Sequence, residues 1–326
     1  MKKLVLALAL AATCAAQAQT TSPVTWKLAT GYRAETFHTQ NLMQLAQDVK
    51  EATAGALQIE VVPNNQLVRL AEIPQAVMEG TKAQAGEAIM VGMTKDFPLA
   101  GADGVPFVVG SYAAAAKLWD LQRPQIEKDF AQRGLRVLYA VPWPPQGLYT
   151  RKPVSTVRDF AGLKMRTYNP TTVRIAELLG ATPVDVPMVQ VGQALAEGRM
   201  DAMITSAVTG VENKVWGGLT HYYELNAWLP KNIVFVNAKA FDALPVASRQ
   251  ALLRAASRAE TRGFALSQQA AQSATDELRR NGMKVEPVPL ELARDLRRMG
   301  ERFSREWVQA TGHGASTLFL RFYGLK

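Results

Sequence analysis

The 326-residue sequence has few of the residues that carry covalent or metal chemistry. It contains one cysteine, Cys14, and three histidines, His38, His221 and His313, which are far apart and lack the spacing of metal ligands. It has no G-x-S-x-G elbow, H-E-x-x-H motif, phosphate-binding Walker loop or G-x-G-x-x-G motif. We therefore expect a protein that is not an enzyme, with no catalytic residue, no metal ion and no cofactor.

Long apolar runs are also missing beyond the N-terminus, so no membrane span is predicted. Residues 1–18 carry two lysines directly after Met1, continue with an apolar run over residues 4–12, and end in the pattern Ala16-Gln17-Ala18. This order is typical of a secretory signal peptide. The residues just before Cys14 do not fit a lipoprotein signal. We therefore favour cleavage after Ala18 and export to the periplasm.

Acidic residues are outnumbered, with 28 aspartates and glutamates against 37 lysines and arginines, which gives a formal net charge of +9. The basic residues are scattered, and no run of five or more occurs. Together with the predicted export, this pattern disfavours a nucleic-acid partner. A modest positive field would help to capture anionic ligands.

The chain is long for a single compact core, so we expect two domains. Residues 24–93 have the order strand, helix, strand, helix, strand, and residues 163–207 repeat this order without repeating the sequence. Such an order predicts parallel strands covered by helices on both faces. The proline-rich stretch "VPWPPQGLYT", 141–150, would cross between the domains, and a strand predicted within 227–237 would return.

The C-terminal third is predicted to be helical. An alanine-rich helix from Pro245 to Arg280 would reach about 50 Å, enough to span two domains. The predicted fold class is therefore α/β, with two domains, parallel-rich sheets, crossing hinge strands and one long domain-spanning helix. The boundaries that we predict are 19–145 with 232–275 for domain I, and 146–231 with 276–326 for domain II.

The stretch "FAGLKMRTYNP", 160–170, places Arg166 near the end of a predicted strand, before a turn that opens a helix. A guanidinium group is planar and permanently charged, and it binds a carboxylate through two parallel hydrogen bonds. A strand end that faces a cleft would hold this group rigidly for an anionic ligand. Taken alone, such an arginine is more commonly part of a surface or interdomain salt bridge.

Three stretches resemble the solute receptors of TRAP transporters, the DctP family. They are "DFAGLKMRTYNPTTVRIAELLGATPVDVP", "VGQALAEGRMDAM" and "EIPQAVMEGTKAQAGEA". With the signal peptide and the long helix, the resemblance covers nearly the whole mature chain. It implies a periplasmic binding protein whose two domains close over a small organic acid. It also implies delivery of that acid to integral membrane subunits driven by an ion gradient, with Arg166 as the residue that binds the ligand carboxylate.

Two departures from the family pattern bear on the ligand. Residues 201–206, "DAMITS", lack the glutamate that helps to hold a metal ion in the oxo-acid-binding branch, which argues against a metal-bridged ligand. Gln146 falls where sialic-acid receptors have a second arginine. Because glutamine is neutral, a second ligand carboxylate is less expected.

The remaining candidates are uncharged donors and aromatic walls. The donors are Gln146, Asn169, Thr205 and Ser206, and the aromatic or loop candidates are Trp143, Tyr168, Trp216, Tyr32 and Phe37. This set predicts a monocarboxylate with a hydroxyl or keto oxygen on the neighbouring carbon and an apolar or aromatic remainder. Pantoate and benzoylformate are examples, whereas succinate should bind poorly.

Three other functions fit the sequence. The chain could be the receptor of an ATP-driven importer, which shares the two-domain architecture, or a periplasmic enzyme on the same fold. A receptor that also signals to a sensor kinase is the third.

The predicted signal peptide gives a direct test. We expect the mature protein to begin at Gln19, because cleavage follows the A-x-A pattern. Intact-mass measurement on protein recovered from the periplasm checks this. A lipid on Cys14, or an uncleaved chain, would contradict the predicted export route.

Overall fold

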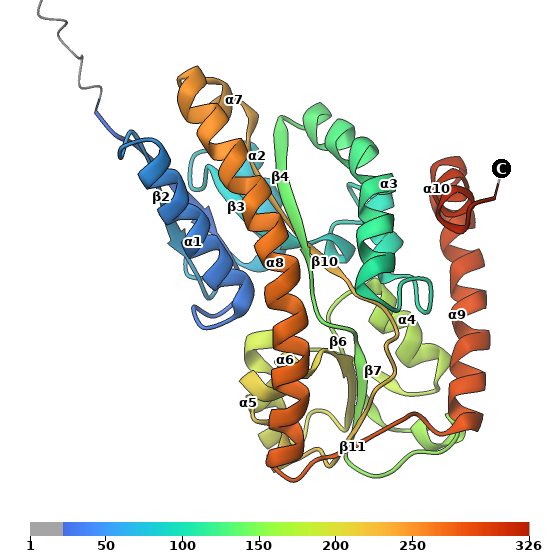
Figure 1. Cartoon of the computed structure of the whole chain (residues 1–326). Coiled ribbons are helices and arrows are strands. Elements are labelled where there is room, and N and C mark those ends of the chain that lie inside the picture. Colours follow the sequence, from blue (N-terminus) through green and yellow to red (C-terminus); the bar gives the residue numbers. More distant parts are fainter. Residues whose placement is uncertain (1–21, 326) are drawn as a thin grey trace, which may run out of the picture.

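The computed structural model describes residues 22–325, so the predicted signal peptide lies outside the described residues. Two sheets form the centres of two domains (Figure 1). The sheet of domain I has the order β2 (Leu57–Val62), β1 (Val24–Ala29), β3 (Ala85–Ile89), β10 (Lys231–Asn237) and β4 (Leu135–Pro142). The sheet of domain II has the order β11 (Lys284–Glu286), β9 (His221–Tyr223), β5 (Gly147–Thr150), β8 (Ala202–Thr205), β6 (Lys164–Thr167) and β7 (Thr182–Asp185).

Each sheet combines parallel and antiparallel strands. Strand β1 is parallel to β2 and β3, and β6 is parallel to β7 and β8. Strand β10 runs antiparallel between β3 and β4, and β5 runs antiparallel to β8 and β9. This arrangement confirms the predicted α/β two-domain class. The short strands β5 and β9 were not predicted.

The two domains are joined by segments that cross together. Strand β4 leads into β5 through residues 143–146, and the chain returns through the residues just before β10. The two crossings are hydrogen bonded to each other, since the Trp143 N–H donates to the Pro230 carbonyl at 2.7 Å and the Gln146 N–H donates to the Trp228 carbonyl at 2.9 Å. The pairing ties the two crossing segments to each other between the domains.

Helices cover both sheets. Those beside the first sheet are α1 (Phe37–Ala52), α2 (Ile73–Glu79), α3 (Tyr112–Gln132) and α7 (Ala238–Asp242). Those beside the second are α4 (Pro170–Leu178), α5 (Val191–Ala196) and α6 (Ala207–Glu212).

Helix α8, Val246–Arg280, runs along both domains (Figure 1). Its first half packs Leu252 and Ala256 into the core beneath α1, and its second half packs Ala274 and Leu278 against α5 and α6. The predicted domain-spanning helix is therefore present.

Two helices complete the chain, α9 (Leu290–Thr311) and α10 (His313–Tyr323). Helix α9 packs Leu292 and Leu296 into the core of domain II, whereas α10 packs Phe319 and Phe322 against α3 of domain I. Helix α10 was not predicted. The domain boundaries given above remain a prediction, and the contact between α10 and α3 places the end of the chain against domain I.

Strand β10 begins with a fully buried ion pair. The Lys231 ammonium group lies 3.3 Å from the Asp103 carboxylate, which also accepts the Lys231 N–H at 2.6 Å. Both side chains are 0% exposed. Removing one partner from such a pair leaves the other as an uncompensated buried charge.

We expect Lys231→Met to lower the free energy of unfolding by about 3–5 kcal/mol. Adding Asp103→Asn should recover part of the loss, because it removes the orphaned charge and keeps an acceptor for the backbone N–H. Urea denaturation measures both variants. As a control, Arg298→Met breaks only an exposed pair with Asp295 and should cost less than about 1 kcal/mol. An unfolding free energy of Lys231→Met equal to that of the wild type would contradict the assignment.

Candidate ligand-binding site

A cavity of about 510 Å³ lies between the two sheets. It is bounded by the carboxyl ends of β1, β2 and β3 from domain I and of β6, β7 and β8 from domain II, where open α/β sheets bind their ligands. Its lining residues are Gly31, Tyr32, Asn65, Arg69, Leu70, Ala71, Ile89, Trp143, Gln146, Arg166, Tyr168, Asp185, Pro187, Met188, Val189, Gln190, Thr205, Ser206, Thr209 and Pro230.

Arg166 is the buried cation of this cavity. It lies on β6 between β7 and β8, and its side chain is fixed by a hydrogen bond from Nε to the Val186 carbonyl at 2.9 Å. The guanidinium carbon lies 4.7 Å from the centre of the Tyr168 ring. One edge of the guanidinium group is thus bound to the protein and one face is covered by an aromatic ring.

The remaining edge of Arg166 forms no ion pair within residues 22–325, although the Asp185 carboxylate lies in the same cavity. Arg166 is only 2% exposed, and its Nη1 atom has no hydrogen-bond partner among the described residues. Burial lowers the pKa of Arg166 to about 10, so the group remains charged at neutral pH. A buried charge is costly unless it is paired. The site is therefore suited to an anion that supplies the missing charge.

The crossing segments form one wall. The Trp143 Nε1–H and the Tyr32 hydroxyl both donate to Asn232 Oδ1, at 2.9 and 3.2 Å. The Tyr168 hydroxyl donates to Gln146 Oε1 at 3.0 Å, and Gln146 Nε2 donates to the Pro144 carbonyl at 2.9 Å. These polar groups are already hydrogen bonded within the protein, so the wall offers a ligand mainly the surfaces of fixed aromatic rings.

A second wall follows β8. The sequence predicted a strand through Ala207, but β8 ends at Thr205 and Ser206 caps α6, with its hydroxyl accepting the Thr209 N–H at 3.5 Å. The Thr205 hydroxyl donates to the Thr209 hydroxyl at 3.0 Å. Three hydroxyl groups therefore lie together at the edge of the cavity.

Seven of the ten predicted site residues line the cavity, namely Arg166, Gln146, Trp143, Tyr168, Thr205, Ser206 and Tyr32. Asn169 does not, because its side-chain oxygen caps α4 by accepting the Thr172 N–H at 2.9 Å. Phe37 packs edge-on against Trp143, with ring centres 5.5 Å apart, and stands behind the cavity wall. Trp216 packs on the core of domain II. Whether each residue contacts a ligand stays a prediction.

Several lining residues were not among the predicted ones. Asp185 ends β7 and lies in the same cavity as Arg166, while Asn65 and Arg69 belong to the loop after β2. Asp185 could have been found, because it ends a strand of the predicted parallel set next to that of Arg166. The loop after β2 has no strand or helix pattern that would place it over the cavity.

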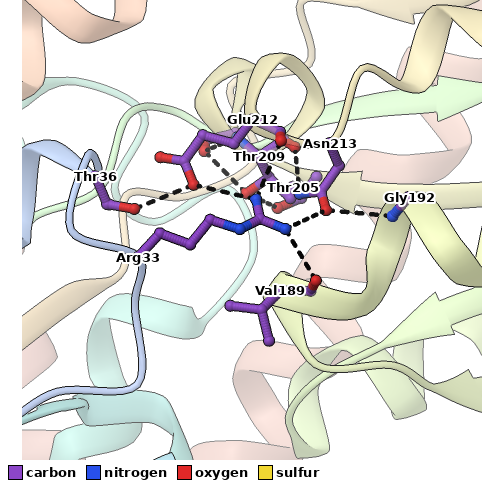
Figure 2. A network of polar contacts seen from close by, with 9 residues as sticks. Arg33, Thr36, Val189, Gly192, Thr205, Thr209, Glu212 and Asn213 are labelled. Carbon is purple, nitrogen blue, oxygen red and sulfur yellow. Dashed lines mark hydrogen bonds and ion pairs between the residues drawn. The ribbon is translucent and has the colours of Figure 1, made fainter. Parts of the chain in front are cut away.

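Arg33 and Thr36 connect the domains outside the cavity (Figure 2). Both belong to the loop between β1 and α1, and their partners are in domain II. The Arg33 guanidinium group donates to the carbonyls of Glu212 and Val189 at 3.0 and 2.9 Å. The Thr36 hydroxyl donates to the Glu212 carboxylate at 3.1 Å. The two domains are therefore in contact across the cleft.

Two further observations concern the described part of the chain. Between residues 22 and 325, no group of three His, Cys, Asp or Glu side chains is placed to hold a metal ion. In the same range, no helix combines the length and the apolar character needed to cross a membrane.

Two α/β domains, a double crossing between them and a buried cation facing the cavity define a two-domain solute-binding protein. The chain belongs to the DctP family, whose model, described as bacterial extracellular solute-binding protein, family 7, matches residues 28–308. This confirms the resemblance seen in the sequence. This family and its structural relatives are solute-binding receptors rather than enzymes.

Known relatives extend over most of the chain. It is 38% identical to DctP6, a Bordetella pertussis extracytoplasmic solute receptor binding pyroglutamic acid, with a TM-score of 0.90 and coverage of 92% of this chain and 100% of that one. It is 34% identical to a marine metagenome TRAP solute-binding protein specific for pyroglutamate, with a TM-score of 0.90 and coverage of 93% and 99%. The 2,3-diketo-L-gulonate-binding periplasmic protein of Escherichia coli is 26% identical over 248 residues, 73% of each chain.

The guanidinium edge of Arg166 that has no partner in the described part of the chain predicts how substitutions there change ligand affinity. Arg166→Ala should leave the fold intact and weaken binding of an organic acid by about 2–5 kcal/mol, because the bound carboxylate would lose its charged partner in a buried site. Arg166→Lys should restore only part of the affinity, since an ammonium group cannot form two parallel hydrogen bonds. Isothermal calorimetry measures both. Wild-type affinity in Arg166→Ala would show that the carboxylate binds elsewhere.

Proposed function

We propose that this protein is the extracytoplasmic receptor of a TRAP-type importer and that it captures a small organic monocarboxylate, with pyroglutamate as the first candidate. The observation that carries the proposal is the buried guanidinium group of Arg166, which has one edge without a partner. A ligand carboxylate would complete its hydrogen bonds and neutralise its charge at the same time.

Two relatives support pyroglutamate as the first ligand to test. Two solved receptors that are 38% and 34% identical to this chain, and that match nearly their whole length, are described as binding pyroglutamate. Pyroglutamate carries a single carboxylate, which agrees with a single buried arginine at the site. Its lactam nitrogen stands next to the carboxylate-bearing carbon, where the sequence predicted a hydroxyl or keto oxygen.

The cavity has groups for the rest of such a ligand. The small, partly apolar ring would pack between Trp143 and Tyr168, which are held in place by Asn232 and Gln146. The lactam has one donor and one acceptor. The hydroxyl groups of Thr205, Ser206 and Thr209 can act in either role, because each carries one O–H and two lone pairs.

Two alternatives receive less support. A receptor for an ATP-driven importer shares the architecture, but the family match and the TRAP relatives favour the ion-gradient-driven class. A periplasmic enzyme would need reactive groups at the ligand. The hydroxyls in the cavity are not adjacent to a histidine that could act as a base, since none of the cavity-lining residues is histidine.

The proposed partners and location follow from the class. As a TRAP receptor, the protein would work in the periplasm and pass its ligand to integral membrane subunits. The site that we propose consists of Arg166 as the carboxylate-binding residue, with Trp143, Gln146, Tyr168, Tyr32, Thr205 and Ser206 around it.

Calorimetry and thermal denaturation with a panel of acids test the proposal. Protein refolded from denaturant, and therefore free of co-purified ligand, should bind pyroglutamate. Its melting temperature should rise, because a ligand at 100 times its Kd stabilises the folded state by about 2.7 kcal/mol. Proline is a matched control, since it has the same ring and carboxylate but a charged amine instead of the lactam.

The rest of the panel separates the possible outcomes. Pantoate and benzoylformate represent the 2-hydroxy and 2-oxo acids, and succinate represents dicarboxylates. Binding of either monocarboxylate without pyroglutamate would overturn the first candidate and keep the monocarboxylate class. Binding of succinate alone would overturn the class.

A further inference from the structure

We infer that Arg33 is a positioning residue that, together with Glu212, clasps the two domains shut and sets the rate at which a bound ligand leaves. We call the set Arg33, Thr36, Val189, Glu212 and Asn213 the clasp (Figure 2). The inference rests on the proposed function, because it concerns retention of the ligand by a closing receptor.

Arg33 makes contacts that only a closed cleft allows. Its guanidinium group donates to the Glu212 carbonyl at 3.0 Å, to the Val189 carbonyl at 2.9 Å and to Asn213 Oδ1 at 3.3 Å. Arg33 precedes α1 of domain I, whereas all three acceptors belong to domain II and are 156 to 180 residues away in sequence. Separation of the domains would break all three hydrogen bonds together.

The acceptors are held ready for Arg33. Asn213 Oδ1 also accepts the Gly192 N–H at 3.2 Å, and Asn213 Nδ2 donates to the Thr209 carbonyl at 2.9 Å. Val189 and Thr209 themselves line the cavity. The clasp is therefore connected to the cavity wall. Formation of its hydrogen bonds would fix the positions of residues that would surround the ligand.

Arg33 differs from Arg166 in its surroundings. Its side chain is 24% exposed, and it does not line the cavity. In an open cleft it would be hydrated, so it needs no ligand to satisfy its charge. Its loss should act on the equilibrium between open and closed forms and on ligand release more than on the first encounter with the ligand.

Glu212 makes closing of the two domains depend on pH. Burial raises the pKa of Glu212 to about 7, opposed by the Thr36 hydroxyl and the Arg33 charge and increased by Glu35. All three of these groups lie on the loop between β1 and α1. Lys214, two residues after Glu212, is the next charged residue along the chain, whereas residues 263–275 of α8 and residues 187–196, which include α5, contain no ionisable side chain.

The raised pKa of Glu212 sets the direction in which domain closure changes with pH. An open cleft would return the Glu212 carboxyl group to water and to a pKa near 4.5, so closing takes up a proton between pH 4.5 and about 7. The closed form is therefore favoured as the pH falls below 7 and loses this advantage above it.

Release kinetics of pyroglutamate test the clasp. In stopped-flow measurements, Arg33→Ala should increase the dissociation rate at least about tenfold and change the association rate less than about threefold. Arg33→Lys should restore part of the slow release, because one ammonium group can still reach one carbonyl. Arg133→Ala is the matched control, since Arg133 pairs with Asp96 within domain I, and it should release at the wild-type rate.

The pH profile tests Glu212. We expect the wild-type Kd to be about tenfold larger at pH 8 than at pH 6, the change given by a pKa of about 7 when closed and 4.5 when open. Glu212→Gln should show no such change. A profile that is the same in the wild type and in Glu212→Gln would overturn the role of Glu212.

A distance measurement separates this inference from the choice of ligand. Residues 22–325 contain no cysteine, so spin labels can be attached at Lys50→Cys on α1 and Ala196→Cys on α5, both exposed. In the ligand-free protein at pH 6, the closed population should be larger in the wild type than in Arg33→Ala.

Identical distance distributions in the two proteins, or identical release rates, would overturn the clasp. Failure of the wild type to bind pyroglutamate would instead overturn only the proposed ligand, because the ligand-free distances test the clasp without it.

Discussion

The structure is organised around one buried positive charge, Arg166, which forms no ion pair among residues 22–325. Arg166 is held by the Val186 carbonyl and the Tyr168 ring, and both contacts orient the guanidinium group without neutralising it. A buried charge without a paired partner is costly, and an anionic ligand would reduce that cost. We therefore expect the free energy of closing to be coupled to the ligand, because a carboxylate enclosed in the cavity would pair with this guanidinium group.

The fold permits this coupling by joining the domains where the site is. Residues 143–146 cross between the sheets and also supply Trp143 and Gln146 to the cavity wall. The returning crossing supplies Pro230 to the wall, and Asn232 just beyond it anchors both Trp143 and Tyr32. A movement at this crossing would involve the residues of the aromatic wall directly, and α8 packs on both domains.

The features of the fold and the site that the sequence could predict are those with a local sequence pattern. The long helix followed from composition, the parallel strands from the alternation of strands and helices, and Arg166 from a strand end that resembled a known family. Residue type was a poorer guide at Asn169, which caps α4 and does not line the cavity, because side chains that cap helices and side chains that bind ligands are the same types. The Arg33 contacts left no local signal, since their partners are 156 to 180 residues away.

We assign different roles to the two arginines, ligand binding to Arg166 and domain closure to Arg33. Arg166 keeps its charge at any pH well below about 10, so the charge to which we assign carboxylate binding is constant under physiological conditions. The clasp has a group, Glu212, that changes its charge at about pH 7 when buried. Under these two proposals, the charge that recognises the ligand stays constant within the physiological range, whereas domain closure, and with it the Kd, responds to pH. The proposed clasp would therefore leave the choice of ligand unchanged and make its binding weaker as the pH rises above about 7.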